Sequence, residues 1–389
     1  MVLEDLILSA NTGADAIKRA PIIEEESDLR CLRIGDVSQK RKYDEWGYTR
    51  TTEEDYMRYR LEVDDIIIAR TGNTIGVNCI IEENVNAVYN NGLIRLKADV
   101  SKVVPQYLYY IISEKKCQDY IQSIAYGTST QPNMKIKDFL RYEPEYQSLE
   151  IQKKIISIID PINKKIGANE KINRNLSEQA NTYYESWKLE LTGEPVELSS
   201  VIDVRDGTHA SPKPQDEGYP LVTSKHLFEY DVDLDSPNKI SQQDYDKTNE
   251  RSKVAYHDVL MSMIGTVGLV SFISRKEINF AIKNVALFRT SQNEELAYYF
   301  LLYLKSKETK QYIEACMAGS TQQYISLTEL RKMPIVVPGE EISEFNLIVK
   351  PMIDTICSNV RENQRLTEIR DSLLPKLMTG ELDVSELDI

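Results

Sequence analysis

The sequence predicts an α+β protein in which two similar α/β-type domains are joined by two long antiparallel helices that form a coiled coil. One heptad seam runs over residues 155–187 and again over 345–377, shifted by 190 positions (345 − 155). Each copy has two asparagines in its middle. Other landmarks recur at similar offsets, so the chain is an internal duplication with a pseudo-twofold.

The size and composition of the chain limit what it can be. Its 389 residues are enough for two or three domains with cores of their own. No apolar run approaches the roughly 18–20 residues of a membrane span, and the start MVLEDLILSANTG lacks signal-peptide features. We therefore expect a cytoplasmic protein with no membrane partner. Five scattered cysteines and three histidines indicate reduced thiols and no metal site.

The net charge of −14 lowers the expectation of nucleic-acid binding, because phosphate contacts need lysine and arginine. Net charge is summed over the whole chain, however, and a basic surface that binds DNA can be present on a protein whose net charge is negative. Acidic residues gather in stretches such as Glu24–Asp28, whereas Lys40-Arg41-Lys42 is basic. The charge therefore does not exclude DNA binding.

The first domain is predicted over residues 1–148. Short apolar runs between Gly, Asn and Thr turns predict strands; the runs are Leu32–Val37, Ile66–Ala69, Val77–Ile81 and Leu93–Leu96. A helix follows over Pro105–Ala125, then a loop that opens with Gly127, and a short strand that ends near Pro144. The predicted plan is a mixed region with short strands, followed by a helix, a loop and a short strand.

The second domain, residues 195–338, repeats this plan. The segment Asp65–Gly72, followed by Gly76, matches Asp258–Gly265, followed by Gly268, at an offset of 193 (258 − 65). A helix is predicted over 295–317, a loop opens with Gly319, and a strand ends near Pro338. The recurring glycines are interpreted as backbone turns.

Two long helices are predicted over residues 149–194 and 339–380, and an acidic tail over 381–389. More than four heptads of unbroken 4-3 spacing favour a coiled coil over an amphipathic helix packed on its own domain. The first seam consists of Ile155, Ile159, Ile162, Ile166, Asn169, Asn173, Leu176, Ala180, Tyr183 and Trp187. The second consists of Phe345, Val349, Met352, Ile356, Asn359, Asn363, Leu366, Arg370, Leu373 and Leu377. Pro161 and Pro351 predict a kink or a restart.

The seam asparagines predict the register of the helix pair. A buried amide needs a partner, so asparagine in a seam lowers stability and fixes register. If the helices are antiparallel about the seam centres, Asn169 faces Asn363 and Asn173 faces Asn359. The seams span about 48 Å at 1.5 Å per residue, so the pair would hold two similar domains at a set separation.

Several segments together resemble the specificity subunit of type I restriction–modification systems along the whole chain. They are RDGTHASPKPQDEGYPLVTSKHL (205–227), GSTQQYISLTELRKMPIVVP (319–338), RLTEIRDSLLPKLMTGEL (365–382) and, in the first copy, GTSTQPNMKIKDFLRYEPE (127–145). The order, doubling and spacing of the segments carry the resemblance. In the first copy, residues 11–15 replace the DGTH segment, which suggests a different half-site.

The resemblance implies two target recognition domains, each of which reads one half of a bipartite site in double-stranded DNA. The helices would set the spacing and dock methyltransferase subunits, and two such subunits are expected. Motor–nuclease subunits would join in systems that cleave DNA. No cofactor is expected in this chain; S-adenosylmethionine and ATP would be bound by the partner subunits.

The motifs of a self-sufficient enzyme are absent from the sequence. There is no GxxxxGK[ST] phosphate loop and no Asn/Asp-Pro-Pro-aromatic methyltransferase signature. Glu308-Thr309-Lys310 is interpreted as a solvated helix face, and no nucleophile motif accompanies the histidines. We expect a non-catalytic targeting subunit. The alternative from another class is a coiled-coil scaffold with two protein-binding domains and no DNA role.

Candidate DNA-reading residues are polar side chains in loops, because base edges are read by hydrogen bonds. In the first domain they are Lys40, Arg41, Lys42, Tyr43, Thr128, Ser129, Thr130, Gln131 and Asn133. In the second they are Arg205, Thr208, His209, Ser211, Lys213, Ser224, Lys225, His226, Gln322, Gln323 and Tyr324. Each could instead be a solvated loop residue. Lys40–Lys42 suit phosphate better than bases, and His209 could cap a turn.

Overall fold

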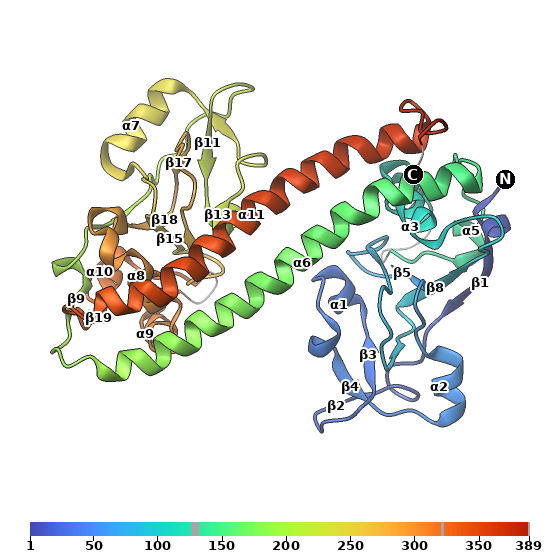
Figure 1. Cartoon of the computed structure of the whole chain (residues 1–389), viewed down its shortest axis with the longest axis horizontal. Helices are drawn as coiled ribbons and strands as arrows, with labels where there is room; N and C mark the ends of the chain where they lie inside the picture. The colour runs from blue at the N-terminus through green and yellow to red at the C-terminus, as the bar shows by residue number, and fades with distance from the viewer. Residues whose placement is uncertain (126–131, 320–322, 388–389) are drawn as a thin grey trace. The chain divides into compact units, whose positions relative to one another are not determined.

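The structure is a computed structural model that describes residues 1–125, 132–319 and 323–387 (Figure 1). The chain divides into two compact units. Unit 1 comprises residues 1–163 and 368–389, and unit 2 comprises residues 164–367. Each unit therefore contains one globular region and a stretch of both long helices.

The main sheet of unit 1 has four strands in the order β1-β8-β5-β6, and all neighbours are antiparallel. Its strands are β1 (Ile7–Thr12), β8 (Leu93–Ala98), β5 (Ile66–Ala69) and β6 (Asn78–Ile80). Every residue of β5 is buried, which fits its unbroken run of apolar side chains. The strands predicted around residues 66–69, 77–81 and 93–96 are confirmed.

A second sheet in unit 1 has the order β2-β4-β3-β7. Its strands are β2 (Ile22–Ile23), β4 (Gly47–Thr49), β3 (Arg30–Leu32) and β7 (Ala87–Tyr89). The strand predicted over residues 32–37 is wrong, because β3 ends at Leu32 and helix α1 (Ile34–Ser38) follows. The carboxylate of Asp36 accepts a hydrogen bond from the Arg33 backbone N–H at 2.9 Å, which starts the helix.

The helix predicted over residues 105–125 is two helices, α3 (Pro105–Ser113) and α4 (Lys115–Ala125). The chain is extended at Glu114, with ψ of 146°. α3 packs on β6 and β8 of the main sheet. Unit 1 also contains α2 (Glu53–Tyr59) and α5 (Ile136–Phe139). No strand forms near Pro144 in the described part of unit 1.

Unit 2 repeats the main sheet with the order β10-β18-β15-β16. Its strands are β10 (Val204–Asp206), β18 (Val285–Phe288), β15 (Val259–Ser262) and β16 (Val270–Phe272). All pairs are antiparallel, as in unit 1. The predicted duplication is confirmed, since the two sheets have the same strand order and the same pairing.

The remaining strands of unit 2 form small sheets. A three-stranded sheet contains β14 (Lys239–Ile240), β11 (Tyr219–Val222) and β17 (Ala281–Ile282). Its parallel pair β11–β17 corresponds to the parallel pair β3–β7 of unit 1. Two-stranded sheets join β12 (Leu227–Phe228) with β13 (Asp231–Val232), and β9 (Val196–Glu197) with β19 (Pro334–Ile335).

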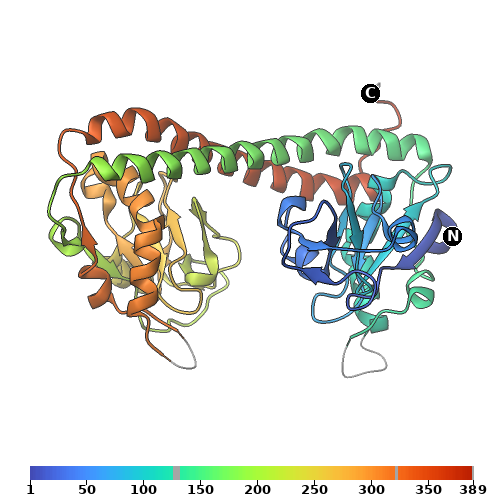
Figure 2. The same ribbon diagram turned by 90° about the horizontal axis from the view of Figure 1, so that it is seen from below.

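The helix predicted over residues 295–317 is likewise divided, into α8 (Ala297–Lys305) and α9 (Lys307–Cys316). Ser306 is extended and its hydroxyl caps α9 by accepting from the Thr309 backbone N–H at 3.2 Å. Figure 2 shows α8 and α9 beside the strands of unit 2. Helices α7 (Gln242–Ser252) and α10 (Leu327–Arg331) complete the unit.

The long helices are α6 (Leu149–Trp187) and α11 (Ile342–Thr379). Each continues through its proline, Pro161 or Pro351, so the helices do not restart there and a kink stays a prediction. All twenty seam positions are buried or half-buried. In unit 2, Trp187 packs on Phe345 with ring centroids 4.4 Å apart. In unit 1, Ile155 and Ile159 join a core that includes Leu377.

One glycine in each unit lies where the main chain passes too closely for a side chain. A Cβ on Gly13 would lie 2.2 Å from the Tyr89 carbonyl oxygen, and one on Gly207 would lie 2.3 Å from the Ile282 carbonyl oxygen. Parallel bridges follow each glycine, between Ala14 and Asn90 and at the matching position of unit 2. The first copy therefore keeps the glycine of the DGTH segment although its neighbours differ.

Candidate nucleic-acid interface

In unit 1, the turn after β5 is joined to the loop that precedes α5. The Met134 N–H donates to the Arg70 carbonyl at 2.8 Å, and the Gly72 N–H donates to the Pro132 carbonyl at 3.2 Å. The Arg70 guanidinium donates to Oδ1 of Asn133 at 3.2 Å. Asn133, a predicted DNA-reading residue, is thus exposed at a fixed position beside this turn.

Unit 2 contains the same junction. The Ile325 N–H donates to the Met263 carbonyl at 3.0 Å, and the Gly265 N–H donates to the Gln323 carbonyl at 3.1 Å. Gln323 and Tyr324 are exposed. We call residues 70–76 with 132–134, and residues 263–268 with 323–325, the turn–loop junctions. The predicted residues Thr128, Ser129, Thr130, Gln131 and Gln322 lie outside the described residues.

Paired glycines shape both junctions. Gly72 has φ of 82° and Gly265 has φ of 80°. Neither has a neighbouring atom within 4 Å of an added Cβ. The left-handed backbone, not lack of space, is therefore what these positions require. The prediction that these glycines form turns is confirmed.

The DGTH segment of unit 2 is held by hydrogen bonds within the unit. His209 uses Nε2 with the Asp206 carboxylate at 2.9 Å and Nδ1 with Asn284 Oδ1 at 2.7 Å. Asp206 is buried and also pairs with Arg251. Both ring nitrogens of His209 are already used, so a base contact through either would require one of these bonds to break.

The other predicted residues of this segment divide into two groups. The Arg205 guanidinium donates to Asp203 at 2.7 Å and to the Arg251 carbonyl at 2.8 Å. Thr208 accepts from the Ala210 N–H at 3.1 Å. These two side chains stabilise the loop. Ser211, which accepts from Lys283 at 2.7 Å, and Lys213 are exposed.

The segment Ser224–His226 forms a short 3-10 turn that precedes β12. His226 Nδ1 accepts from the Thr223 N–H at 2.9 Å. Burial lowers the pKa of His226, which favours the neutral ring that this acceptor role needs. His226 is therefore a structural residue, while Ser224 is half-buried and Lys225 is exposed.

The basic segment Lys40–Tyr43 follows α1 in unit 1. Lys40 and Lys42 are exposed, and Lys40 has φ of 52°. Arg41 forms an ion pair with Asp36 at 3.2 Å. Tyr43 packs edge-on against Trp46 with ring centroids 5.5 Å apart. Arg41 and Tyr43 thus have structural contacts, and the charge of the exposed lysines suits phosphate.

The helix pair joins the four seam asparagines as predicted. Asn169 Nδ2 donates to Asn363 Oδ1 at 2.8 Å, and Asn359 Nδ2 donates to Asn173 Oδ1 at 2.8 Å. Asn169 also donates to Glu362 at 2.7 Å. This bond and the neighbouring Lys165 hold the pKa of Glu362 below its usual range. All of these residues belong to unit 2.

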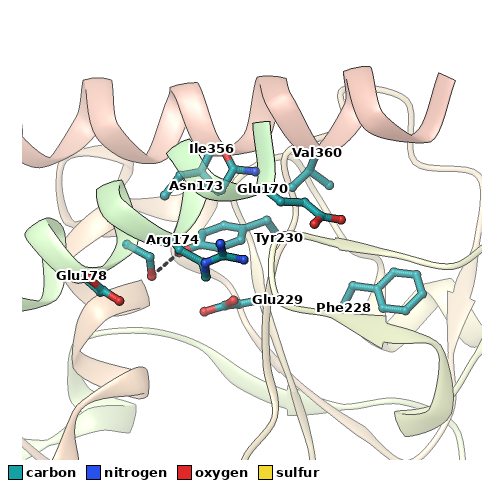
Figure 3. A pocket seen from close by; sticks show the side chains of 10 residues that line it. Glu170, Asn173, Arg174, Glu178, Phe228, Glu229, Tyr230, Ile356 and Val360 are labelled. Atoms are coloured by element: carbon teal, nitrogen blue, oxygen red, sulfur yellow. Dashed lines mark hydrogen bonds between the residues drawn. The ribbon is translucent and has the colours of Figure 1, made fainter. Parts of the chain in front are cut away.

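A hollow of about 450 Å³ in unit 2 lies between α6, α11 and the β12–β13 turn (Figure 3). The Ser177 and Tyr230 hydroxyls are 3.3 Å apart across it. The ammonium of Lys305 lies 4.9 Å from the Tyr230 ring centroid and pairs with Glu229. The Ser177 contact joins the β12–β13 turn to α6, and the Lys305 contacts join it to α8. The lining contains none of the predicted DNA-reading residues.

Two features of other protein classes are missing from the described residues. No group of three His, Cys, Asp or Glu side chains there could hold a metal ion. No helix in the described ranges is long and apolar enough to cross a membrane.

Sequence reasoning missed Arg70, which contacts Asn133 in the junction of unit 1. The residue directly follows a buried strand, in the run IIIARTG, and its counterpart at an offset of 193 is Met263. The two copies match in this segment except that one has a cation where the other has an apolar residue. This difference was the signal that could have identified Arg70.

The chain thus contains a duplicated domain in which exposed loops that differ between the copies lie on a sheet of the same strand order. The sequence model of the family described as "Type I restriction modification DNA specificity domain" matches residues 9–178 and again 192–367. The chain belongs to this family and contains two copies of its domain.

Two relatives and one solved structure support the assignment. The type I restriction enzyme MjaIX specificity subunit of Methanocaldococcus jannaschii is 28% identical over 319 residues, 73% of this chain and 71% of the relative. The HindI specificity subunit of Haemophilus influenzae is 22% identical over 378 residues, 76% of this chain and 82% of the relative. The crystal structure of the type I S subunit from M. genitalium has a TM-score of 0.58 at 17% identity. The match covers 97% of this chain and 95% of that one, and it shows the same fold.

Proposed function

We propose that this chain is the DNA specificity subunit of a type I restriction–modification complex, in which each unit reads one half of a bipartite site. The observation that carries this function is the doubled turn–loop junction. Both units keep its backbone hydrogen bonds, while the exposed side chains beside it differ, Asn133 in one and Gln323 and Tyr324 in the other. Retained geometry with changed polar groups is what two readers of different sequences need.

The helix pair would set the spacing between the half-sites. The two asparagine pairs support this role, because a one-heptad slip would place amides against apolar seam residues. Removing one heptad from both helices shortens the pair by about 10 Å, or about 3 base pairs of DNA at 3.4 Å each. The spacer should shorten accordingly while both half-sites stay the same. An unchanged spacer in an assembled complex would refute the role.

The chain directs catalysis that other subunits perform. Two methyltransferase subunits would dock on the helices and bind S-adenosylmethionine, and motor–nuclease subunits would bind ATP. We place the complex in the cytoplasm, where it meets double-stranded DNA. The purified chain with S-adenosylmethionine and DNA should transfer no methyl group, whereas adding the methyltransferase subunit should produce adenine methylation. Transfer by the pure chain would contradict the targeting role.

A further inference from the structure

The two turn–loop junctions, together with the residues that follow them, differ in their cations. The hydrogen bonds from Met134 to Arg70 and from Ile325 to Met263 align the two copies residue by residue. In that alignment, three positions that carry cations in unit 1 carry uncharged residues in unit 2. Arg70, Lys135 and Lys137 correspond to Met263, Ser326 and Thr328.

Arg70 is held at a fixed position by its main chain. Its N–H donates to the Gly92 carbonyl at 2.9 Å, and its carbonyl accepts from the Met134 N–H at 2.8 Å. The preceding strand β5 is completely buried. The main chain of Arg70 is therefore held in place, as the reading of a nucleotide base by its side chain requires.

The Arg70 side chain has unused hydrogen-bonding capacity. The half-buried guanidinium donates one bond, from Nη2 to Asn133 Oδ1 at 3.2 Å. Its Nε is buried without a partner among the described residues. No ion pair joins Arg70 to a carboxylate in the described parts of the chain. A guanidinium oriented by a neutral amide and lacking a counter-charge is suited to an anionic or acceptor-rich ligand.

We infer that Arg70 is a specificity-determining residue that contacts a base edge in the half-site bound by unit 1, with Asn133 as its positioning partner. The inference rests on the proposed function. Arginine pairs in bidentate fashion with O6 and N7 of guanine, the commonest specific contact in the major groove. The exposed Lys135 and Lys137, which lack ion-pair partners in the described ranges, contact phosphates beside it.

The direct test replaces Arg70 by the residue that unit 2 carries at this position. In unit 2 the Met263 carbonyl accepts the matching hydrogen bond, from the Ile325 N–H, so Arg70→Met should fold. The variant and the wild-type chain are each combined with the methyltransferase subunit, and methylated sites are mapped by genome-wide sequencing. Arg70→Met should reduce discrimination at one base pair of one half-site by roughly 5- to 150-fold, with the other half-site unchanged.

Three further variants separate reading from charge. Arg50→Met removes an exposed arginine of the same unit that pairs with Glu25, and it should leave the motif unchanged. Arg70→Lys keeps the charge but loses the bidentate geometry, so it should relax the same base pair. Gln323→Ala should relax the other half-site. Replacing Lys135 by Ser and Lys137 by Thr should keep the motif and reduce the salt-dependence slope by about 2.

The outcomes distinguish this inference from the proposed function. If the wild-type complex methylates no bipartite site, the proposed function fails. If it does and Arg70→Met leaves both half-sites unchanged, Arg70 does not read a base and this inference alone is overturned. Equal weakening of both half-sites by Arg70→Met would overturn it as well.

Discussion

The two units of this chain show which parts of a recognition domain are retained and which are exchanged. Their main sheets have the same strand order. Residues with a left-handed backbone conformation recur at matching positions, such as Gly72 with Gly265 and Asp64 with His257. The side chains beside the retained turns differ, with Arg70 in unit 1 and Met263 in unit 2. Backbone geometry is therefore held constant while chemistry changes at the loops.

The units also differ in how they hold the long helices. In unit 2 the contact is aromatic, since Phe345 lies among Trp187, Tyr184 and Tyr299. In unit 1 the equivalent contact is aliphatic, with Ile155 and Ile159 in the same core as Leu377. Aromatic pairs of this kind contribute about 0.5–1.5 kcal/mol each beyond the area that they bury.

The largest expected effect comes from breaking this aromatic contact. Phe345 is completely buried, so Phe345→Ala should destabilise unit 2 by about 3–5 kcal/mol through lost burial and a residual cavity. The two tryptophans report the units separately, because Trp46 lies in unit 1 and Trp187 in unit 2. In urea, the Trp187 transition should move to lower concentration more than the Trp46 transition. Equal shifts would show that the units unfold as one.

The next effect tests the close main-chain approach that both units keep. Gly13→Ala and Gly207→Ala would each force a Cβ to within about 2.3 Å of a carbonyl oxygen. Each should reduce the free energy of unfolding by about 1–3 kcal/mol. Gly167→Ala is the control, since this α6 position has no atom within 4 Å and alanine should stabilise the helix by about 0.5–1 kcal/mol. A harmless Gly13→Ala would mean that the first copy does not need this glycine.

A smaller difference is expected between the two asparagine pairs. Asn169 is buried and bonds both Asn363 and Glu362, so Asn169→Ala should cost about 1–3 kcal/mol by leaving amide groups unpaired. Asn173 is half-buried, so water can replace it and Asn173→Ala should cost less than about 1 kcal/mol. Thermal unfolding of the two variants measures both. The reverse order would contradict the view that the buried pair of Asn169 with Asn363 contributes more to the register.

The smallest effect concerns a buried aspartate that both units place before the central strand. Burial raises the pKa of Asp65 and of Asp258 above the usual 3.8. A raised carboxyl pKa contributes stability that is present below pH 3.8 and is lost as pH rises through the folded-state pKa. Relative to Asp65→Asn and Asp258→Asn, the wild-type chain should therefore lose stability as the pH rises from 3.8 through the raised folded-state pKa. Urea titrations across that range check the sign, and a relative gain would contradict it.

Much of the fold could be predicted because duplication makes weak signals repeat. The heptad seams, the four facing asparagines and the strand at residues 66–69 follow from periodicity and from comparison of the copies. The helix breaks at Glu114 and Ser306 could not be predicted, because the apolar pattern continues across both. The junction contact of Arg70 with Asn133 depends on residues 63 positions apart in sequence, and local pattern carries no record of it.

Residues 32–37 show that local sequence pattern can also fail over a short segment. The apolar pattern there predicts a strand, yet one hydrogen bond from the Arg33 N–H to Asp36 ends the strand and begins a helix. Similarly, His209 looked like a base reader because it is polar and in a loop. Its two bonds within the unit, to Asp206 and Asn284, became visible only in three dimensions.

The central claim is that each unit reads its own half-site, and a chain with one reader used twice tests it most directly. Residues 1–148 would be replaced by a second copy of residues 195–338, with both long helices kept. Combined with the methyltransferase subunit, this chain should methylate an inverted repeat of the half-site read by unit 2, with the spacer of the wild-type motif. An assembled complex that still methylates the original asymmetric motif would contradict the claim.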